Sequence, residues 1–310
     1  MDLPRFSVII PVHNGESSIG TCLDSVMGLD YPRDRREIIV VDNMSTDRTR
    51  EVVQQYPVTC LEERTRQSSY AARNRGIAVA TGEILAFADA DCRPRPGWLR
   101  AYAAHFGRHQ DDYVSGPVDL VIDGPVGPCA LYDKGKFFLQ ERYFRSGWGA
   151  TANLAVRRAL MDRVEAFDGS VISGGDVEFC LRARRNGARM GFCPDARVFH
   201  PVRGTLKALV KKHVRLGFGQ AQLAFRHGNG FLLPFELDRL LPHLRILRRL
   251  PGLSYREVPP RLIPLLILVD WICGLAWAYG NVRGALTYRS PASVAGWVAT
   301  KILTMPRARR

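Results

Sequence analysis

The sequence predicts an α/β fold in which a doubly wound sheet is flanked by helices. Two observations predict this class. Short apolar runs, such as 6–12, 37–41 and 83–88, are typical of buried strands and alternate with segments of helical spacing. Each run also ends in a polar turn, as expected of parallel strands whose carboxyl ends meet at one edge of a sheet. Ligands bind at that edge in open α/β sheets, so functional residues are expected there.

The first strand, 6–12, leads into a polar turn. The strand includes Val12 and breaks at Pro11, and a helix begins a few residues later. Asn14 and Glu16 lie in the turn between the strand and the helix. The turn is therefore a candidate binding surface at the carboxyl edge of the sheet.

The second strand, 37–41, is followed by Asp42 and by a helix that Thr46 or Asp47 can cap. Asp42 is left at the ligand edge as an acceptor for a base or a ribose, although a simple turn residue would look the same. A third strand at 58–61 completes the alternation of strands and helices.

The triplet Asp89-Ala90-Asp91 directly follows the buried strand 83–88. Two carboxylates separated by one small residue suit a hard divalent ion that also holds phosphate oxygens. A solvated acidic turn is the alternative interpretation, because such triplets are common. A helix is expected over 68–80, and it includes Arg73.

Length and composition are those of a globular enzyme. The 310 residues suffice for one large core or two modest domains, and 46% hydrophobic residues with 24% charged residues exclude a disordered chain. The net charge of +14, carried largely by arginines after about residue 180, predicts an anionic partner. No nucleic-acid-binding motif occurs, so no nucleic-acid partner is expected. Seven scattered cysteines without a Cys-x-x-Cys pair fit a reducing cytosol.

Four motifs, in this order along the chain, resemble those of family 2 glycosyltransferases of the GT-A fold. The motifs are IIPVHNGE, IIVVDNMSTDRT, AARNRGIAVATGEILAFADADCRP and GGDVEFCLRARRNG. The resemblance covers about two thirds of the chain, from Phe6 to Pro201. It implies a mixed, doubly wound sheet, a nucleotide-sugar donor that is expected to be a UDP-sugar, Mn²⁺ or Mg²⁺ as cofactor, and inversion at the anomeric carbon.

The resemblance also implies roles for individual residues. Asp176 matches the catalytic base of the family, although Gly175 stands where the family commonly has Glu. Glu178 is the alternative base, and either acid could instead serve only the helix dipole. The residues expected at the nucleotide sugar are Pro11, Val12, Asn14, Glu16, Asp42, Arg73, Asp89, Ala90 and Asp91.

Metal and acceptor residues are implied in the same way. Asp89, Asp91 and His200 are expected to hold the metal, with a purely structural histidine as the alternative. Trp148, Asn153 and Glu178 are expected on the acceptor side, Trp148 by stacking on a sugar face. The aromatic residues Phe137 and Phe138 are expected to be ordinary core.

Three further elements are expected before residue 201. A helix opened by Pro96 is predicted over 94–106. Strands are predicted over 113–122 and 189–199, the second ending just before His200. A loop rich in Gly and Pro follows the first of these strands.

The C-terminal third changes character. Leucines and arginines alternate at helical spacing over 235–250, as in an interfacial helix. The apolar segment 262–280 is barely long enough to span a bilayer and has Asp270 at its centre, so a hairpin or an in-plane helix is predicted. The basic segment 211–215 could close over a diphosphate or face lipid, and the basic tail 305–310 suits an anionic leaflet.

Together these patterns predict three regions. Residues 1–92 form a nucleotide-sugar-binding half, 93–202 an acceptor-binding half and 203–310 a basic, helical extension. The predicted protein is a glycosyltransferase at the cytoplasmic face of the cell membrane, peripheral or shallowly inserted, with a saccharide or lipid-linked acceptor of the cell envelope. A catalytically silent membrane scaffold, a sugar nucleotidyltransferase and a glycosidase are the alternatives.

Overall fold

The computed structural model describes residues 3–227, 241–243, 245–253 and 258–288. The chain forms two compact units. Unit 1 consists of Met1–Asp123, Phe138–Ser170 and Gly175–Val202, and unit 2 of Gly124–Phe137, Val171–Gly174 and Arg203–Arg310. Each unit is described by itself.

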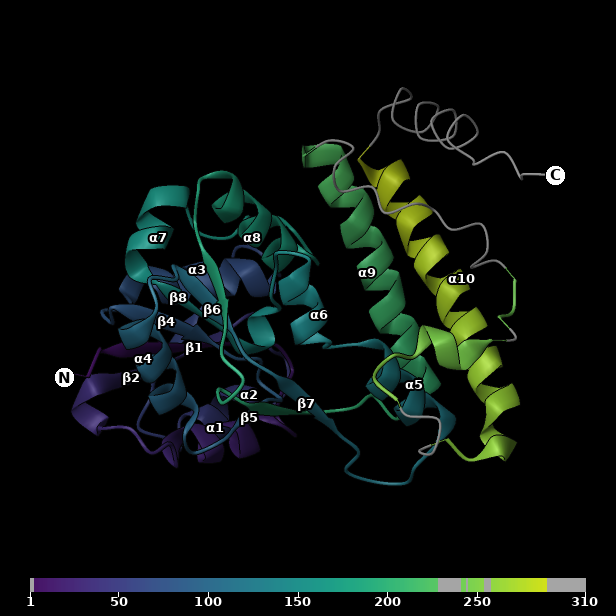
Figure 1. Ribbon diagram of the computed structural model, residues 1–310, viewed down its shortest axis with the longest axis horizontal. Helices are drawn as coiled ribbons and strands as arrows, with labels where there is room; N and C mark the ends of the chain where they lie inside the picture. The colour runs from purple at the N-terminus through teal and green to yellow at the C-terminus, as the bar shows by residue number, and fades with distance from the viewer. Residues whose placement is uncertain (1–2, 228–240, 244, 254–257, 289–310) are drawn as a thin grey trace. The chain divides into compact units, whose positions relative to one another are not determined.

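Unit 1 is built on a seven-stranded sheet with the order β3-β2-β1-β4-β8-β6-β9 (Figure 1). The first four strands are parallel, β8 is antiparallel to both β4 and β6, and β9 is parallel to β6. The mixed sheet of the predicted α/β class is thus confirmed. The strands are β1 (Phe6–Val12), β2 (Arg36–Asp42), β3 (Thr59–Glu62), β4 (Ile84–Phe87), β6 (Tyr113–Ser115), β8 (Leu154–Arg157) and β9 (Met190–Phe192).

Helices pack on this sheet because its central strands are apolar on both faces. Every residue of β1 and β4 is buried, as expected for a sheet covered on both sides. Helix α3 lies so close to β1 that a Cβ at Gly76 would come within 2.7 Å of Ile9. The helices of unit 1 are α1 (Ile19–Met27), α2 (Thr49–Val53), α3 (Ser69–Val79), α4 (Trp98–Arg108), α6 (Gln140–Arg145), α7 (Arg158–Val164) and α8 (Gly175–Arg185).

A second, three-stranded sheet of unit 1 has the order β5-β10-β7. Its strands are β5 (Arg93–Pro94), β7 (Val118–Val121) and β10 (Val198–Pro201). The predicted helix over 94–106 therefore begins too early. Arg93–Pro94 pairs with β10, Gly97 is the N-cap, and helix α4 starts only at Trp98.

Two predicted strands are each divided between the two sheets. The segment 113–122 forms β6 in the large sheet and β7 in the small one, and 189–199 forms β9 and then β10. The break after β6 falls at Gly116, where a Cβ would lie 2.1 Å from the carbonyl oxygen of Ala196. As a consequence, His200 lies inside β10 rather than after a strand.

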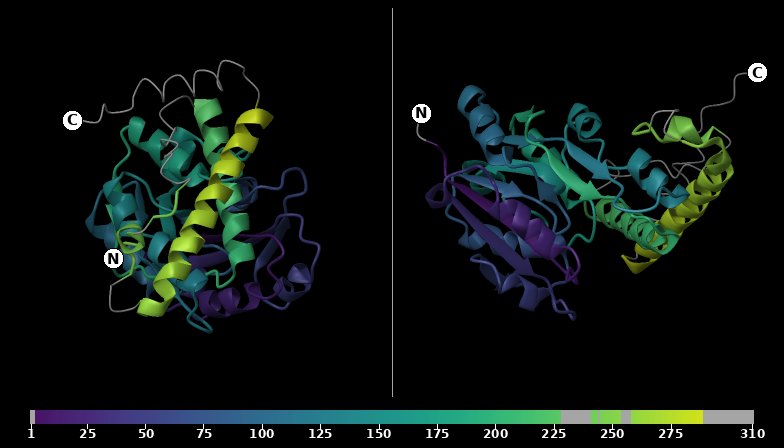
Figure 2. Two further views of the ribbon diagram at one scale, coloured as in Figure 1. Left: turned by 90° about the vertical axis from the view of Figure 1, so that its right-hand side faces the viewer. Right: turned by 90° about the horizontal axis from the view of Figure 1, so that it is seen from below.

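Unit 2 is helical. Its main elements are α5 (Pro128–Lys136), α9 (Leu206–His227) and α10 (Ile263–Thr287), with short 3₁₀ turns at Ile246–Arg249 and Pro260–Leu262. Helices α9 and α10 run side by side (Figure 2). Glycines allow this approach, since a Cβ at Gly217 would lie 2.0 Å from the carbonyl oxygen of Trp277 and one at Gly280 would lie 2.1 Å from that of Val214.

A hairpin or an in-plane helix is predicted for 262–280. The hairpin is wrong, because this segment lies within one continuous helix, and the in-plane orientation stays a prediction. By length and composition alone, Pro260–Thr287 is long and apolar enough to cross a membrane, and a core helix can pass the same test. Asp270, at its centre, is buried against cations of the same unit. Of the predicted interfacial helix at 235–250, residues 235–240 and 244 lie outside the described residues, and Ile246–Arg249 forms a 3₁₀ turn. All of the tail 305–310 lies outside the described residues.

Candidate active site

The turns that follow β1 and β2 are joined to each other by hydrogen bonds. Asn14 Oδ1 accepts from the Thr46 N–H at 2.8 Å, and the Asn14 N–H donates to Ser45 Oγ at 2.9 Å. Glu16 forms an ion pair with Arg48 at 2.5 Å, and this pair lowers the pKa of the Glu16 carboxyl. Asn14 and Glu16, both predicted at the nucleotide, thus fix the geometry of this edge.

Asp42 is the last residue of β2 and is 4% exposed. Its Oδ2 accepts a long hydrogen bond of 3.4 Å from the Ser45 N–H, whereas Oδ1 is buried without a partner. Leaving a buried acceptor unsatisfied costs about 1–3 kcal/mol. Asp42 Oδ1 is therefore ready to accept a hydrogen bond from a ligand. Pro11 and Val12 lie on the neighbouring strand, and Val12 accepts from the Asn43 N–H through its carbonyl oxygen.

Arg73 and Asp89 form an ion pair at the end of β4. Arg73 lies on α3 with a nearly buried side chain, and its Nη2 is 2.5 Å from Asp89 Oδ1. Nε of the same guanidinium is buried and has no partner. Asp89 keeps about a third of its side chain exposed, so the pair presents both a donor and an acceptor at the ligand edge. Ala90 follows, partly buried.

Asp91 and His200 come together from distant parts of the chain. His200 Nδ1 lies 2.7 Å from the carbonyl oxygen of Pro201, which can only accept, so Nδ1 carries the proton. The other ring nitrogen, Nε2, then has a lone pair that faces Asp91 Oδ1 at 3.2 Å. Two acceptors at this distance repel each other unless a proton on Nε2 or a metal cation lies between them. Phe138, expected in the core, packs on the His200 ring with centroids 4.5 Å apart.

These two residues fit a divalent metal ion. The ligand atoms of Asp91, Cys92 and His200 lie within 4.8 Å of one another. Burial raises the pKa of the Cys92 thiol, and its Sγ donates to the Ala152 carbonyl, so Cys92 is a poor ligand at neutral pH. An imidazole nitrogen and a carboxylate oxygen remain, a set that Mn²⁺ accepts. Asp89 is not in this group and is held by Arg73 instead.

Asp176, the predicted base, lies in the first turn of α8. Its Oδ1 accepts from the Tyr70 hydroxyl at 3.2 Å and from the Val177 N–H at 3.0 Å. No described residue bonds to Oδ2. Burial raises the pKa of this carboxyl, while the Val177 N–H, Arg73 and Tyr70 oppose the shift. A carboxylate with one oxygen held, the other free and a raised pKa suits proton abstraction.

Glu178 is placed differently, although it is only two residues further along. It is 3% exposed and forms a two-pronged ion pair with Arg182, at 2.7 and 3.0 Å. Arg182 also donates to the carbonyl oxygens of the loop 164–166. Glu178 therefore stabilises the fold around α8, and its oxygens are occupied.

The two other residues predicted on the acceptor side also differ from each other. Asn153 is fully buried, and all four of its hydrogen-bonding positions are used within the protein. Its partners are the side chains of Trp98 and Tyr102 and the carbonyl oxygens of Pro117 and Ala196. Trp148 is partly exposed and stacks on Tyr143 with ring centroids 4.0 Å apart, so one aromatic face is already covered.

Two residues of the site were missed in the sequence. Tyr70 bonds the predicted base, and Phe138 packs on the predicted metal ligand. Tyr70 directly precedes the motif that contains Arg73, and this proximity was the available signal. Phe138 has a positive φ of 54°, which no apolar pattern reveals.

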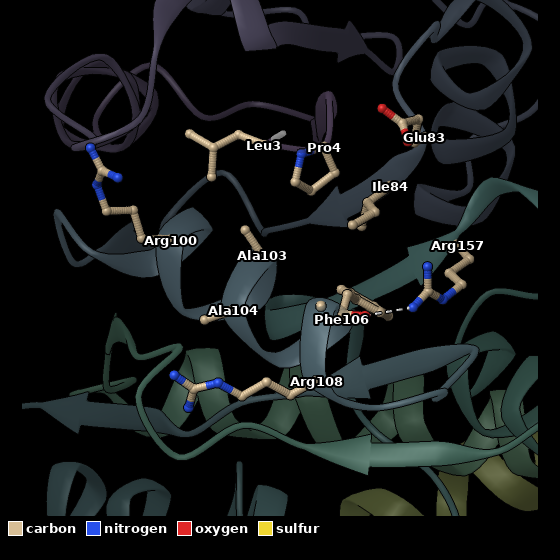
Figure 3. Close-up of a pocket in the computed structure, with 11 residues that line it drawn as sticks. Leu3, Pro4, Glu83, Ile84, Arg100, Ala103, Ala104, Phe106, Arg108 and Arg157 are labelled. Carbon is tan, nitrogen blue, oxygen red and sulfur yellow. Dashed lines mark hydrogen bonds between the residues drawn. The ribbon is translucent and has the colours of Figure 1, made fainter. Parts of the chain in front are cut away.

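A cavity of about 600 Å³ lies away from this site (Figure 3). Its lining includes Pro4 and Ile84, which lie at the amino ends of β1 and β4, and residues of α4 such as Arg108. Arg157 also lines it and donates to the Phe106 carbonyl oxygen at 2.9 Å. Ligands of α/β sheets bind at the carboxyl ends of the strands. This cavity lies at the amino ends and is therefore not the predicted ligand-binding site.

A mixed sheet with polar and acidic side chains at the carboxyl ends of its parallel strands is typical of α/β proteins that bind a ligand at this edge. The model of the family "Glycosyl transferase family 2" matches residues 7–162, about half of the chain. Glycosyltransferase AglE of Haloferax volcanii is 37% identical over 227 residues, which cover 71% of this chain and 74% of that protein. The chain belongs to glycosyl transferase family 2.

Further relatives and solved structures agree. The pre-mycofactocin glycosyltransferase of Mycobacterium tuberculosis is 29% identical over 232 residues, 71% of this chain and 48% of that protein. The mannosyltransferase PcManGT of Pyrobaculum calidifontis, solved with GDP-Man and Mn²⁺, has a TM-score of 0.55 at 22% identity and covers 99% of this chain and 82% of its own. TarS 1-349 of S. aureus with UDP-GlcNAc has a TM-score of 0.54 at 21% identity and covers 94% and 92%.

These two structures share the GT-A-like fold of this chain. Family membership, together with the named relatives, identifies the protein as a glycosyltransferase. The predicted enzyme class is confirmed, and the interpretations as a sugar nucleotidyltransferase, a glycosidase or a silent scaffold are not supported.

Proposed function

We propose that this glycosyltransferase moves a sugar from a nucleotide-sugar donor to a saccharide or lipid-linked acceptor, with inversion and with Asp176 as the base. The observation that carries the proposal is the state of the Asp176 carboxyl. Its Oδ1 is fixed by two donors, while Oδ2 is bonded to no described residue. A UDP-sugar is the donor that we favour, because the structural neighbour TarS 1-349 was solved with UDP-GlcNAc.

The donor would bind along the carboxyl edge of β1, β2 and β4. Asp42 Oδ1, buried and unpaired, would accept the N–H of the base. Arg73 Nε, also buried and unpaired, would donate to the ligand, and Asp89 would accept from the ribose. Asn14 and Glu16 would act by holding the two turns that frame the base.

A divalent ion would be held by Asp91 and His200. When bound, it would neutralise charge on the departing diphosphate as a Lewis acid. The tautomer of His200 supports this role, since its Nδ1–H is taken by the Pro201 carbonyl and Nε2 is left as a ligand. One structural neighbour was solved with Mn²⁺.

The reaction proposed here is a single displacement. An acceptor hydroxyl has a high pKa, so it must lose its proton as its oxygen attacks the anomeric carbon. Asp176 Oδ2 would take this proton while the bond from the anomeric carbon to the nucleoside diphosphate breaks. Attack from the face opposite the leaving group inverts the anomeric configuration.

The test replaces Asp176 by Asn, which keeps the shape and the hydrogen bonds to Oδ1. Turnover at saturating donor should fall by about two to four orders of magnitude, the usual scale for a lost general base, while donor binding persists. The neighbouring Glu178→Gln variant serves as the matched control and should keep most of the turnover. A nearly normal Asp176→Asn rate beside a collapsed Glu178→Gln rate would reassign the base.

We also propose that unit 2 binds the cytoplasmic face of an anionic membrane peripherally, where lipid-linked or envelope saccharides are found. The exposed face of α10 carries Leu265, Leu268, Leu275, Tyr279, Val282 and Leu286. The exposed residues Lys207, Lys211 and Arg215 of α9 follow at intervals of four, which places three cations on one helix face. Exposed apolar side chains on one helix and a row of exposed cations on another suit an interfacial element.

Co-sedimentation with vesicles tests this second proposal. Binding to phosphatidylglycerol vesicles should exceed binding to phosphatidylcholine vesicles, and high salt should release the protein. Replacing the three α9 cations by Gln should weaken binding more than replacing Arg33, Arg75 and Arg108, three exposed arginines of unit 1. Equal loss in both variants would contradict a specific face, and resistance to alkaline carbonate would indicate a bilayer span.

A further inference from the structure

Tyr70 is the side chain that fixes the orientation of the Asp176 carboxyl. Its hydroxyl donates to Asp176 Oδ1 at 3.2 Å, and the side chain is 6% exposed. The residue lies in the first turn of α3, where the Ser68 side chain accepts from its N–H. The Tyr70 ring is further held by Phe167, with centroids 5.7 Å apart. A hydroxyl fixed by this much packing is a rigid donor.

The residue before Asp176 is a glycine because the Tyr70 ring occupies the space beside it. A Cβ at Gly175 would lie 2.9 Å from two ring carbons of Tyr70 and 3.0 Å from a third. Real Cβ contacts are essentially never this short, so a side chain at position 175 would displace the ring. The glycine therefore lets the tyrosine reach the carboxyl.

Tyr70 also lies beside the donor-side ion pair. The Arg73 guanidinium carbon is 5.5 Å from the Tyr70 ring centroid, and Arg73 binds Asp89. The charged groups that act on the Asp176 carboxyl are thus Arg73 and Asp89, which oppose each other. Tyr70 adds a neutral hydrogen-bond donor to the same carboxyl. The direction of this hydrogen bond is set by the packing of the Tyr70 ring rather than by charge.

We propose that Tyr70 is a positioning residue of the transfer reaction: it holds Asp176 Oδ1 so that Oδ2 faces the acceptor hydroxyl, and Gly175 is required to admit its ring. This proposal rests on the proposed function, because it takes Asp176 as the base. Tyr70 itself takes no proton from the acceptor. Its contribution is to keep one rotamer of the base populated, which is how orientation lowers a barrier.

The experiment measures transfer kinetics of Tyr70→Phe, which keeps the ring and removes the hydroxyl. kcat should fall about tenfold, the scale of one hydrogen bond to a charged group, while the KM for donor stays unchanged. The acidic limb of the pH profile should move to higher pH, because a donor to the ionised carboxyl is lost. Gly175→Ala, which pushes on the ring, should change kcat in the same direction.

Tyr56→Phe is the matched control, since the Tyr56 hydroxyl donates to the Asp24 carboxylate at 2.8 Å elsewhere on unit 1. It should leave kcat and the pH profile unchanged. The Tyr70→Phe change should also cost nothing more once Asp176 is Asn, because there is then no base to position.

The outcomes separate the two proposals. Full turnover by Asp176→Asn would overturn the base and, with it, the role of Tyr70. Lost turnover in Asp176→Asn beside a wild-type kcat and pH profile in Tyr70→Phe would overturn the positioning role alone. An equal loss in Tyr70→Phe and Tyr56→Phe would also overturn it.

Discussion

Carboxylates of the site in unit 1 and of the helices in unit 2 are bonded differently. In unit 1, Asp42 and Asp176 each have an oxygen that no described residue bonds, and Asp91 faces the lone pair of a histidine nitrogen. In unit 2, Asp133 and Asp270 are each paired with cations. A buried polar atom without a hydrogen-bond partner, such as Asp42 Oδ1, costs stability, and a ligand that bonds to it offsets this cost.

The pairs of unit 2 lie inside the helical unit. Asp133 is fully buried, and its Oδ1 is 2.8 Å from Lys212 Nζ. Burial lowers the pKa of Lys212 to about 7, against the opposing effect of Asp133. Asp270 lies 3.5 Å from both Lys136 and Arg249. Carboxylates that are paired with cations stabilise one arrangement of the helices and have little capacity left to bind a ligand. The following predictions test this difference between the paired carboxylates of unit 2 and the site carboxylates of unit 1.

The largest effect is expected for Asp133→Ala. This change removes the carboxylate that accepts from the buried Lys212 Nζ and from the Arg203 N–H. Breaking one side of a buried pair costs about 3–5 kcal/mol. Chemical denaturation should report this loss of stability, whereas Asp119→Ala, which removes a partly exposed ion pair with Arg197, should cost less, about 1 kcal/mol. Equal losses of stability in the two variants would contradict the expected difference between buried and exposed ion pairs.

The next effect concerns the metal pair. His200→Ala removes the nitrogen that faces Asp91 and should weaken Mn²⁺ affinity by about 100-fold, at the upper end of the losses seen when support of a metal site is removed. Isothermal titration with Mn²⁺ in the presence of UDP measures this change. His105→Ala provides the control, because His105 is likewise bonded to an aspartate, Asp111, at 2.8 Å. Unchanged affinity in His200→Ala would leave this histidine a structural role only.

The sequence predicted the part of the fold in which local pattern and environment agree. Strands β1, β2 and β4 are short apolar runs, and their carboxyl ends carry the predicted residues of the site. The prediction from sequence was wrong where a contact with a distant part of the backbone determines where a strand ends. The strand predicted over 113–122 divides at Gly116 because the Ala196 carbonyl lies against it. A strand propensity in one segment holds no information about that distant contact.

The site shows the same division. Asp42 and Asp89 follow from motifs at strand ends and Arg73 from a motif on a helix, and Asp91 and His200 lie in contact. The hydrogen bonds that occupy every polar position of the Asn153 side chain could not be predicted from the sequence, because their partners come from three distant segments. The hydroxyl that reaches Asp176 was likewise hidden, since 106 residues separate it from the acid.

A smaller effect compares helical glycines of the two units. Gly280→Ala places a Cβ 2.1 Å from the Val214 carbonyl oxygen, so α9 and α10 must separate, at a cost of about 1–3 kcal/mol. Gly107→Ala, on α4, meets nothing within 4 Å and should stabilise by about 0.5–1 kcal/mol through helix propensity. Denaturation midpoints of the two variants should therefore move in opposite directions. A stabilised Gly280→Ala variant would contradict the close packing of the two helices.

The smallest expected effect is a gain in stability on replacing Asp176 by Asn. Burial raises the pKa of this carboxyl above 3.8, so the folded state holds its proton more tightly than the unfolded state does. Stability is then lost as the pH rises through the raised value, and the ionised carboxylate is a cost at neutral pH. Asn cannot ionise and can still accept from Tyr70, so the melting temperature should rise by roughly 1–3 °C at pH 7.5.

This gain should fade as the pH falls below 3.8, where the wild-type carboxyl becomes protonated in both the folded and the unfolded state. Glu178→Gln, two residues away, should instead lower the melting temperature at pH 7.5, because it weakens the buried pair with Arg182. Opposite changes in melting temperature for these two acids of one helical turn would mean that Asp176 serves catalysis and that Glu178 stabilises the fold. A melting temperature that falls in both variants would show that Asp176 also stabilises the fold. The difference proposed between the carboxylates of the two units would then not hold for Asp176.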